Sequence, residues 1–213
     1  MESNAQLIDY LKACSLIKSK AVEIAFEKVD RKEFVPREHA LHAYEDSPLP
    51  TMGAQTISAP SIVAIMSEAL EVRQGMKVLE VGAGSGYQAA VLAQVVGEKG
   101  KIYSIERVSL LCEFARNNLE RAGVKRVEVI CGDGSKGLLE KAPFDRIIVT
   151  AAAKKIPRPL VEQLKPGGRL LIPIGESPYF QELVLVEKTR GGKIVEKPIL
   201  PVVFVPLVGE HAE

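Results

Sequence analysis

The chain has no tryptophan, few aromatic residues (5%) and almost no excess of either charge. Its 28 lysines and arginines are balanced by 27 aspartates and glutamates, so the formal net charge is +1. Proteins that bind nucleic acid generally carry a basic excess, and single-stranded bases stack on aromatic side chains. An acidic membrane surface also attracts basic proteins. We therefore expect neither a nucleic-acid partner nor a membrane partner for this chain.

Long apolar runs are also missing. The longest stretch without a charged residue, 47–67, is interrupted by Pro48, Pro50 and Pro60, whereas a membrane-spanning helix needs about 20 mostly apolar residues. Residues 1–14 begin with polar side chains and lack the basic and apolar regions of a secretory signal. These features predict a cytoplasmic protein.

Cysteine is scarce. The three cysteines, Cys14, Cys112 and Cys131, are odd in number, lie far apart and include no pair with metal-ligand spacing. This pattern predicts reduced thiols packed inside a cytoplasmic protein, and neither a disulfide framework nor a zinc site. We expect no metal site of any kind.

The remaining composition is that of a folded globular protein. With 213 residues, of which 46% are hydrophobic and 26% charged, the chain can bury a core of its own. It contains no internal repeat, low-complexity tract or flexible linker. We therefore expect one domain over residues 1–213, with a helical cap and substrate loop in 1–70 and an α/β core in 71–213.

The first part of the chain is predicted to be helical over residues 1–45, because apolar residues recur there at spacings of three and four. Ser19 is a candidate N-cap for the second helical run. Residues 46–59 contain turn-forming residues without helical periodicity and predict an ordered loop. A helix is expected to begin at Pro60 and to run to about Leu70, with Ser58 as its N-cap.

From residue 76 the pattern changes to short apolar strands that alternate with helices. This alternation predicts a doubly wound, mostly parallel sheet that is covered on both faces. Two further β-rich runs, 181–188 and 199–208, predict a C-terminal antiparallel hairpin. The expected strands are 76–81, 101–105, 127–131, 145–150 and 169–174, and the expected helices between them are 87–96, 108–122, 135–141 and 157–164.

The sharpest motif is a glycine loop between an expected strand and helix. Glu80 precedes Gly82, Gly84 and Gly86, and position 87 is tyrosine, so the spacing differs from the GxGxxG of dinucleotide sites. Glycines let backbone amides approach a ligand at a helix N-terminus. A carboxylate at position 80 would repel a pyrophosphate and suits a ligand with a positively charged amino group. A tight turn without a ligand is the alternative.

Two more acidic positions follow the next strands. Glu106 ends the second strand of the core, where a carboxylate can accept both hydroxyls of a ribose; a solvated carboxylate, paired with Arg107, is the alternative. Asp133-Gly134 ends the third strand, and Asp133 is placed to accept the exocyclic amine of an adenine, or only to form a turn. All of these residues come at the carboxyl ends of strands, where open α/β sheets bind ligands.

This combination resembles the class I S-adenosylmethionine-dependent methyltransferases, whose fold is Rossmann-like. The resemblance implies that Glu80, Gly82, Gly84 and Gly86 surround the methionine portion of S-adenosyl-L-methionine, and that Glu106 binds its ribose. It places Asp133 and Gly134 near the adenine, and it implies S-adenosyl-L-homocysteine as product. The fourth strand ends in residues 150–153 (TAAA) and lacks the Asn/Asp-Pro-Pro-Tyr motif of methylases that act on base amines.

A second motif, residues 55–60 (QTISAP), is more specific. With the runs 78–93, 164–175 and 203–207, it resembles the protein-L-isoaspartate (D-aspartate) O-methyltransferases over nearly the whole chain. The resemblance implies methyl transfer to the α-carboxylate of L-isoaspartyl residues in damaged proteins and peptides, followed by return through a succinimide to aspartate. It gives Ser58 the active-site role and places Gln55, Thr56, Ile57 and Ser58 along the cofactor.

Three other functions remain as alternatives. The first is a class I methyltransferase with a small-molecule or nucleic-acid acceptor, which cofactor binding alone would not distinguish. The second is a NAD-dependent oxidoreductase, which the loop spacing and Glu80 disfavour. The third is a module that binds the cofactor without turnover.

Overall fold

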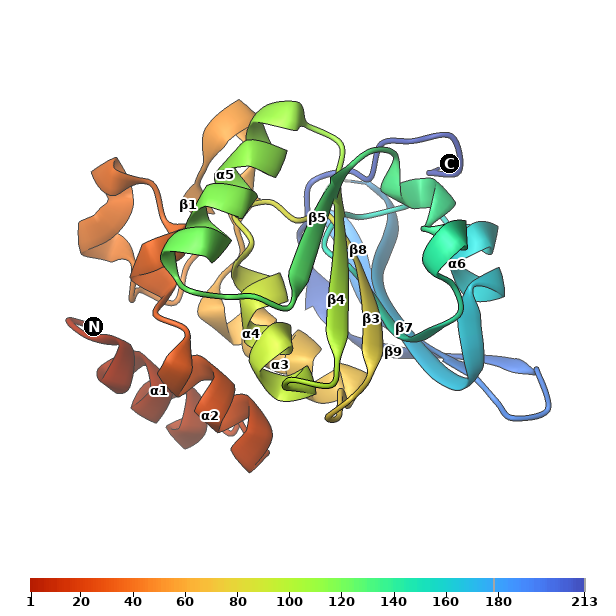
Figure 1. Cartoon of the computed structure of the whole chain (residues 1–213), viewed down its shortest axis with the longest axis horizontal. Helices are drawn as coiled ribbons and strands as arrows, with labels where there is room; N and C mark the ends of the chain where they lie inside the picture. The colour runs from red at the N-terminus through yellow and green to blue at the C-terminus, as the bar shows by residue number, and fades with distance from the viewer. Residues whose placement is uncertain (178, 213) are drawn as a thin grey trace.

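The computed structural model describes residues 1–177 and 179–212, and these form a seven-stranded sheet at the centre of the molecule (Figure 1). The strand order is β5-β4-β3-β6-β7-β8-β9, and the pairs from β5 to β7 are parallel. The chain adds strands on one side of β3 and then returns past β3 to add the rest on the other side. The predicted α/β fold with a doubly wound, mostly parallel sheet is confirmed. The parallel strands are β3 (Lys77–Val81), β4 (Lys101–Glu106), β5 (Val127–Cys131), β6 (Phe144–Val149) and β7 (Leu164–Ser177).

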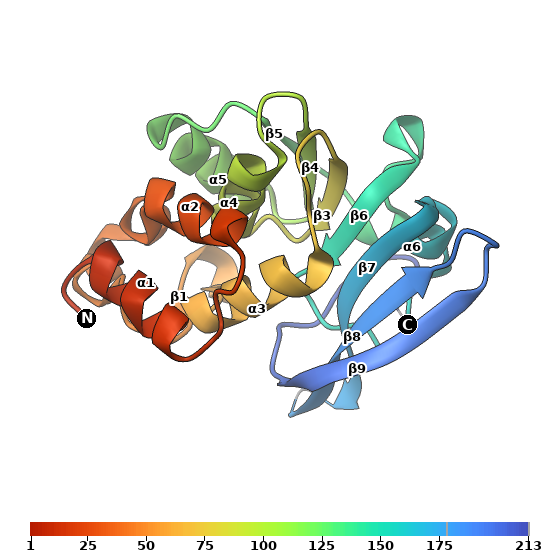
Figure 2. The ribbon, with the colours of Figure 1, turned by 90° about the horizontal axis from the view of Figure 1, so that it is seen from below.

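The central strands β3 and β6 are buried on both faces of the sheet. Neighbouring residues such as Val78 and Leu79 belong to two different hydrophobic clusters, one on each face. Figures 1 and 2 show α3 (Pro60–Leu70), α4 (Tyr87–Val96) and α5 (Ser109–Arg121) on one face and the short α6 (Arg158–Glu162) on the other. No helix within the described residues has the length and apolar character that a bilayer crossing requires.

The C-terminal strands form the predicted antiparallel hairpin. β8 (Phe180–Lys188) pairs with β7 and with β9 (Ile194–Val202), both antiparallel. The second strand lies earlier than the predicted 199–208, and residues 203–208 leave the sheet. β9 tolerates Pro198 and Pro201 because it is the edge strand and a proline there need not donate to a neighbour.

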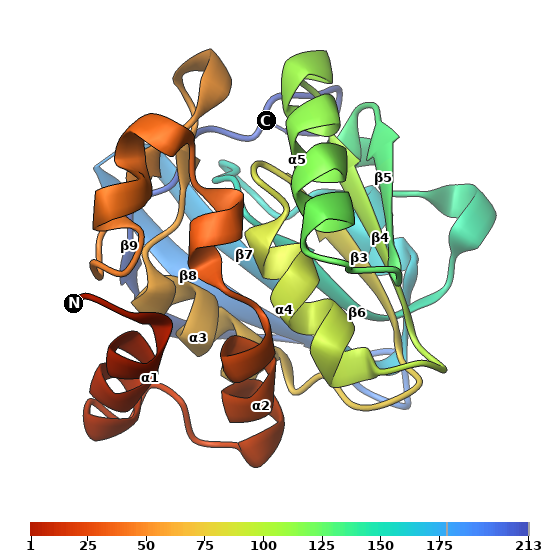
Figure 3. The same ribbon diagram turned by 60° about the vertical axis from the view of Figure 1, so that its left-hand side comes forward.

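The N-terminal residues build a cap over α4, as Figure 3 shows. The predicted N-cap Ser19 is confirmed, since its hydroxyl accepts from the Val22 amide at 3.3 Å. The predicted ordered loop contains a small antiparallel pair of strands. The elements are α1 (Asn4–Ala13), α2 (Lys20–Lys28), 3-10 turns at Arg31–Phe34 and Arg37–His42, β1 (Leu49–Pro50), a 3-10 turn at Met52–Ala54, and β2 (Thr56–Ile57).

Three local predictions are wrong. Ser58 is not the N-cap of α3: Ala59 is, and the Asp46 carboxylate accepts from the Ser61 amide at 2.8 Å in place of a local cap. The helix predicted over 135–141 is two 3-10 turns, Gly134–Lys136 and Leu139–Lys141, because Gly137 between them has a φ of +67°. The helix predicted over 157–164 is shorter, because Leu164 already begins β7.

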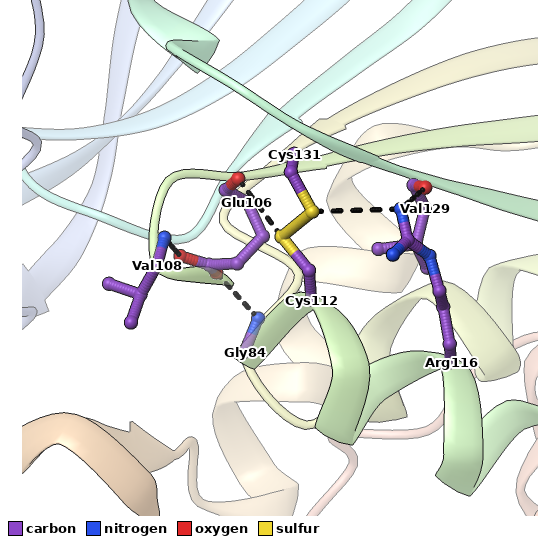
Figure 4. Close-up of a disulfide and its surroundings, with 7 residues drawn as sticks. All are labelled: Gly84, Glu106, Val108, Cys112, Arg116, Val129 and Cys131. Atoms are coloured by element: carbon purple, nitrogen blue, oxygen red, sulfur yellow. Dashed lines mark hydrogen bonds between the residues drawn. A yellow bond between two sulfur atoms is a disulfide. The ribbon is translucent and has the colours of Figure 1, made fainter. Parts of the chain in front are cut away.

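The prediction for the cysteines is also wrong. α5 packs beside β5, and this packing joins Cys112 to Cys131 in a disulfide with Cα atoms 6.0 Å apart (Figure 4). Cys14 is exposed instead of packed. A separation of 19 residues in sequence gave no sign of this pairing.

Candidate active site

The loop after β3 turns sharply at Gly82, between the ends of β4 and β6. Gly82 has a φ of +97°, and a Cβ there would collide with the Thr150 hydroxyl. That hydroxyl donates to the Gly82 carbonyl at 2.6 Å, and the Gly82 amide donates to the Ile105 carbonyl at 2.8 Å. The glycine loop is thus fixed at the reversal point of the sheet, which is where open α/β sheets bind ligands.

The Glu106 carboxylate is tied to this loop. One carboxylate oxygen accepts from the Gly84 amide and the other from the Val108 amide, both at 3.0 Å (Figure 4). The residue is only 8% exposed. Within residues 1–177 and 179–212 it forms no ion pair with Arg107, so the alternative of a solvated carboxylate paired with Arg107 is not what the structure shows. The carboxylate is rigid and still has acceptor capacity for a ligand.

A cavity of about 130 Å³ opens beside Glu106. Its walls come from the β1–β2 hairpin, the glycine loop, the carboxyl ends of β4, β5 and β6 with the residues that follow them, the start of α5, and the segment that follows β9. Six of the predicted site residues line it, namely Gln55, Thr56, Gly82, Gly84, Glu106 and Gly134. Larger hollows of 610 and 710 Å³ exist elsewhere on the chain, but the glycine loop contributes to neither.

The other five predicted site residues lie outside the cavity lining. Ile57 is packed in the core, and Gly86 is packed tightly against Leu119 of α5. The remaining three are Ser58, Glu80 and Asp133, and each makes contacts that bear on its predicted role. The structure thus brings the two sequence motifs together at one cavity without bringing in all of their members.

Asp133 faces the C-terminal segment. One of its carboxylate oxygens accepts from the amide and hydroxyl of Ser135, and the other accepts from the Glu210 amide at 2.8 Å. A Cβ on Gly209 would collide with this carboxylate. These hydrogen bonds outweigh the cost of partial burial and lower the pKa of Asp133. Desolvation alone would raise it. Asp133 therefore anchors the segment whose residues 205–208 form one wall of the cavity.

Ser58 follows the hairpin that carries Gln55 and Thr56 to the cavity. Its side chain is half-buried, and its hydroxyl makes no hydrogen bond to any residue that the structure describes. Its carbonyl, in contrast, accepts from Arg31 at 2.9 Å. The backbone of Ser58 is fixed while its hydroxyl is available to a substrate.

Glu80 lies beneath the loop, between β3 and β4. It is completely buried, the Ser104 hydroxyl donates to its Oε2, and its Oε1 has no partner among the described residues. Burial raises the pKa of Glu80 to about 8, and the nearby Glu106 carboxylate adds to this rise. The side chain is thus protonated at neutral pH and does not reach the cavity lining.

This burial predicts a pH dependence of stability. Because the pKa of Glu80 is higher in the folded than in the unfolded chain, its contribution is complete below about pH 4.5 and is lost as the pH rises toward 8. Through this one group, the free energy of unfolding can fall by at most about 1.4 kcal/mol per pH unit. Glu80→Gln keeps an acceptor for Ser104. We expect this variant to show a weaker pH dependence of the free energy of unfolding, measured with denaturant between pH 5 and 8.

The control for that experiment is Glu120→Gln, a change at an exposed position of α5. This variant should show the same pH dependence of the free energy of unfolding as the original chain. Parallel pH curves for Glu80→Gln and the original chain would show that Glu80 ionises normally in the folded protein.

Sequence reasoning missed two groups of residues. Thr150 holds the glycine loop, and its position at the end of a predicted strand could have suggested that role. Residues 205–208 were taken for part of a strand, but they close the cavity, with Ala152 bonded to Val205 and Leu207 through backbone amides at 2.8 and 2.7 Å. This segment and the hairpin residues Gln55 and Thr56 line the same cavity.

The reversal of strand order at β3, the glycine loop and the strand-end acid define a class I S-adenosylmethionine-dependent methyltransferase. An S-adenosylmethionine-dependent O-methyltransferase from Thermotoga maritima shares this fold, with a TM-score of 0.51 and 22% identity over 67% of this chain and 60% of that one. The family model for protein-L-isoaspartate(D-aspartate) O-methyltransferase matches residues 2–212. The chain belongs to this family.

Individual relatives agree with this assignment. A protein-L-isoaspartate O-methyltransferase from Hyperthermus butylicus is 55% identical, with 99% of this chain and 90% of that one covered. One from Pyrococcus horikoshii is also 55% identical, with 96% and 92% covered. A Plasmodium falciparum structure of the same description, in complex with S-adenosyl-L-homocysteine, has a TM-score of 0.85 and 27% identity, with 98% and 99% covered.

Proposed function

We propose that the chain repairs damaged proteins and peptides by transferring the methyl group of S-adenosyl-L-methionine to the α-carboxylate of L-isoaspartyl residues. The observation that carries the proposal is the cavity itself. One of its walls is the glycine loop with Glu106, and another is the hairpin that leads to Ser58. The methyl donor and the acceptor residue would thus meet at one place.

The residues of the cavity fit this cofactor. Ile105, Val108 and Leu111 offer an apolar surface for a purine ring, and Glu106 offers acceptors for ribose hydroxyls. At about 130 Å³ the cavity is smaller than the roughly 300 Å³ at the lower end of small-molecule sites. Two of its walls, residues 55–56 and 205–208, are loops. We propose that these loops move apart when the cofactor enters.

The roles of the eleven predicted site residues follow from their contacts. Gln55, Thr56, Gly82, Gly84, Glu106 and Gly134 are proposed to contact the cofactor. Ile57, Glu80, Gly86 and Asp133 are proposed to hold the walls of the cavity, and Ser58 to bind the acceptor. Residues 1–70 form the cap and substrate loop, and residues 71–213 the cofactor-binding core.

When bound, S-adenosyl-L-methionine supplies an electrophilic methyl group on a sulfonium. The acceptor carboxyl has an ordinary pKa near 3.5–4, so it is already ionised at neutral pH and needs no general base. The Ser58 hydroxyl would donate to one carboxylate oxygen and leave the other oriented toward the methyl group. The enclosing loops would exclude competing water.

The ester that forms then reacts without the enzyme. The backbone nitrogen of the following residue attacks the ester carbonyl, methanol leaves, and a succinimide remains. Water opens the succinimide partly to normal aspartate and partly to isoaspartate, which can enter the cycle again.

The function is tested by following an isoaspartyl peptide by chromatography in the presence of the chain and S-adenosyl-L-methionine. We expect the isoaspartyl peptide to decline while the succinimide and the aspartyl peptide accumulate. One molecule of S-adenosyl-L-homocysteine should form for each methyl group that is transferred. No decline despite cofactor binding would show that the acceptor is a different compound.

The ribose role of Glu106 gives a separate prediction. Glu106→Ala removes a charged acceptor, so we expect the cofactor Kd, measured by calorimetry, to rise about tenfold, as for one lost hydrogen bond to a charged group. Glu113→Ala, at an exposed position on α5, is the matched control and should not change the Kd. An unaltered Kd for Glu106→Ala would contradict the assignment.

A further inference from the structure

Arg31 is a charged residue that is completely buried, at the start of the first 3-10 turn. Its guanidinium donates to four backbone carbonyls that come from two separate segments. The acceptors and distances are Ala43 at 2.8 Å, Glu45 at 3.3 Å, Ser47 at 3.1 Å and Ser58 at 2.9 Å. Carbonyls of residues 43–47 and the carbonyl of Ser58 are thus held by one side chain.

These two segments are the ends of the β1–β2 hairpin. Residues 48–57 run between Ser47 and Ser58, and Gln55 and Thr56 of this hairpin line the cofactor cavity. Arg31 therefore fixes both ends of the loop that links the cavity to Ser58, the residue proposed to bind the acceptor.

Asp46 adds a second connection between the same segments. Its carboxylate accepts from the Ser61 amide, in the first turn of α3, at 2.8 Å. Arg31 and Asp46, here called the clasp, thereby hold the chain at the Ser58 carbonyl and at the Ser61 amide, three residues further on. The clasp leaves the Ser58 hydroxyl without any partner among the described residues.

The chemistry of the clasp requires arginine. A guanidinium presents five N–H donors in a rigid planar fork, whereas a lysine has one compact ammonium group on a flexible stem. Burial lowers the pKa of Arg31 to about 10, which keeps the group charged at neutral pH. Arg31 can therefore serve several carbonyls at once under all physiological conditions.

We propose that Arg31 is a positioning residue for methyl transfer, which acts by fixing the Ser58 backbone so that the hydroxyl points at the acceptor carboxylate. The inference rests on the proposed role of Ser58. It gives a catalytic consequence to a buried charge whose hydrogen bonds also satisfy four backbone carbonyls of the loop.

A double-mutant cycle tests this inference. Arg31→Lys is expected to lower kcat for an isoaspartyl peptide about tenfold or more, since small displacements of a positioned group can cost up to about 100-fold. The cofactor Kd should change by less than about threefold. In a Ser58→Ala background the same Arg31→Lys change should cost no further kcat, because the group that it positions is gone.

Arg146→Lys is the matched control. Arg146 is also buried and also donates to a backbone carbonyl, that of Leu70 at 2.7 Å. Leu70 is the last residue of α3 and is not part of the hairpin that lines the cavity. This variant should lower the unfolding temperature without changing kcat. If Arg31→Lys fails to fold, as judged by circular dichroism and cofactor binding, Asp46→Ala loosens the other half of the clasp and enters the same cycle.

The outcomes separate the two hypotheses. Unchanged kcat in Ser58→Ala would contradict the role of Ser58 and this inference with it. This inference alone would be overturned if Ser58→Ala lowered kcat and Arg31→Lys did not. It would also be overturned if Arg31→Lys lowered kcat by the same factor in the original chain and in Ser58→Ala.

Discussion

Replacing Ser58 by alanine is expected to lower methyl transfer to an isoaspartyl peptide about 100-fold while the cofactor Kd stays within about twofold. The hydroxyl would donate to a charged oxygen, and such a bond is worth about 1.5–3 kcal/mol. Losing it also frees the acceptor to rotate away from the methyl group, so the effect falls on turnover. The measurement is kcat at saturating cofactor, with the Kd taken from calorimetry.

The matched control is Ser61→Ala, three residues further along the chain. The Asp46 contact uses the backbone amide of Ser61, and that amide is kept. This variant should turn over at the rate of the original chain. Equal activity of the two variants would remove Ser58 from the mechanism.

Replacing Gly84 by alanine is expected to raise the cofactor Kd about 100-fold. A Cβ at Gly84 meets no protein atom within 4 Å, and the residue lines the cavity. We therefore expect the added methyl group to stand in space that the cofactor needs, and overpacking a closely fitted site costs about 1–3 kcal/mol. The Kd is again measured by calorimetry.

Gly123→Ala controls for backbone strain. Gly84 and Gly123 have φ values of +53° and +67°, and a Cβ on Gly123 also meets no atom within 4 Å. Both changes should therefore cost about 1–2 kcal/mol of folding free energy, seen as similar drops in unfolding temperature. Only Gly84→Ala should lose the cofactor. Equal Kd values for the two variants would show that the glycine loop does not surround the ligand.

The core of the fold could be predicted from the sequence because its signals are local. Helix α4 and strand β5 have the predicted bounds, Tyr87–Val96 and Val127–Cys131, since a glycine turn or a change of periodicity marks each end. The predicted strands also placed Glu106 at the ligand-binding edge of the sheet, because the carboxyl ends of parallel strands share one edge.

The errors occurred where tertiary contacts overrode local pattern. Ser58 has the residue type of a helix cap, but Asp46, which is distant in sequence, supplies the acceptor near that helix start. Residues 203–208 have the apolar character of a strand, yet they cover the cavity and bond to Ala152. Neither contact leaves a sign in the neighbouring sequence.

Arg31 shows the same limit for the site. It stands in a run of four charged residues, 30–33, which reads as a solvated segment. Only the fold brings the carbonyls of residues 43–47 and of Ser58 around its guanidinium. A buried arginine becomes recognisable once its acceptors are known, not from its own position in the chain.

The most direct test of the account uses methyl-labelled S-adenosyl-L-methionine and two peptides that differ only in having an isoaspartyl or a normal aspartyl residue. Base-labile methyl ester is counted after incubation of each peptide with the purified chain. We expect label on the isoaspartyl peptide and none on its aspartyl twin. Equal label on both peptides, or label on neither while the cofactor is bound, would contradict it.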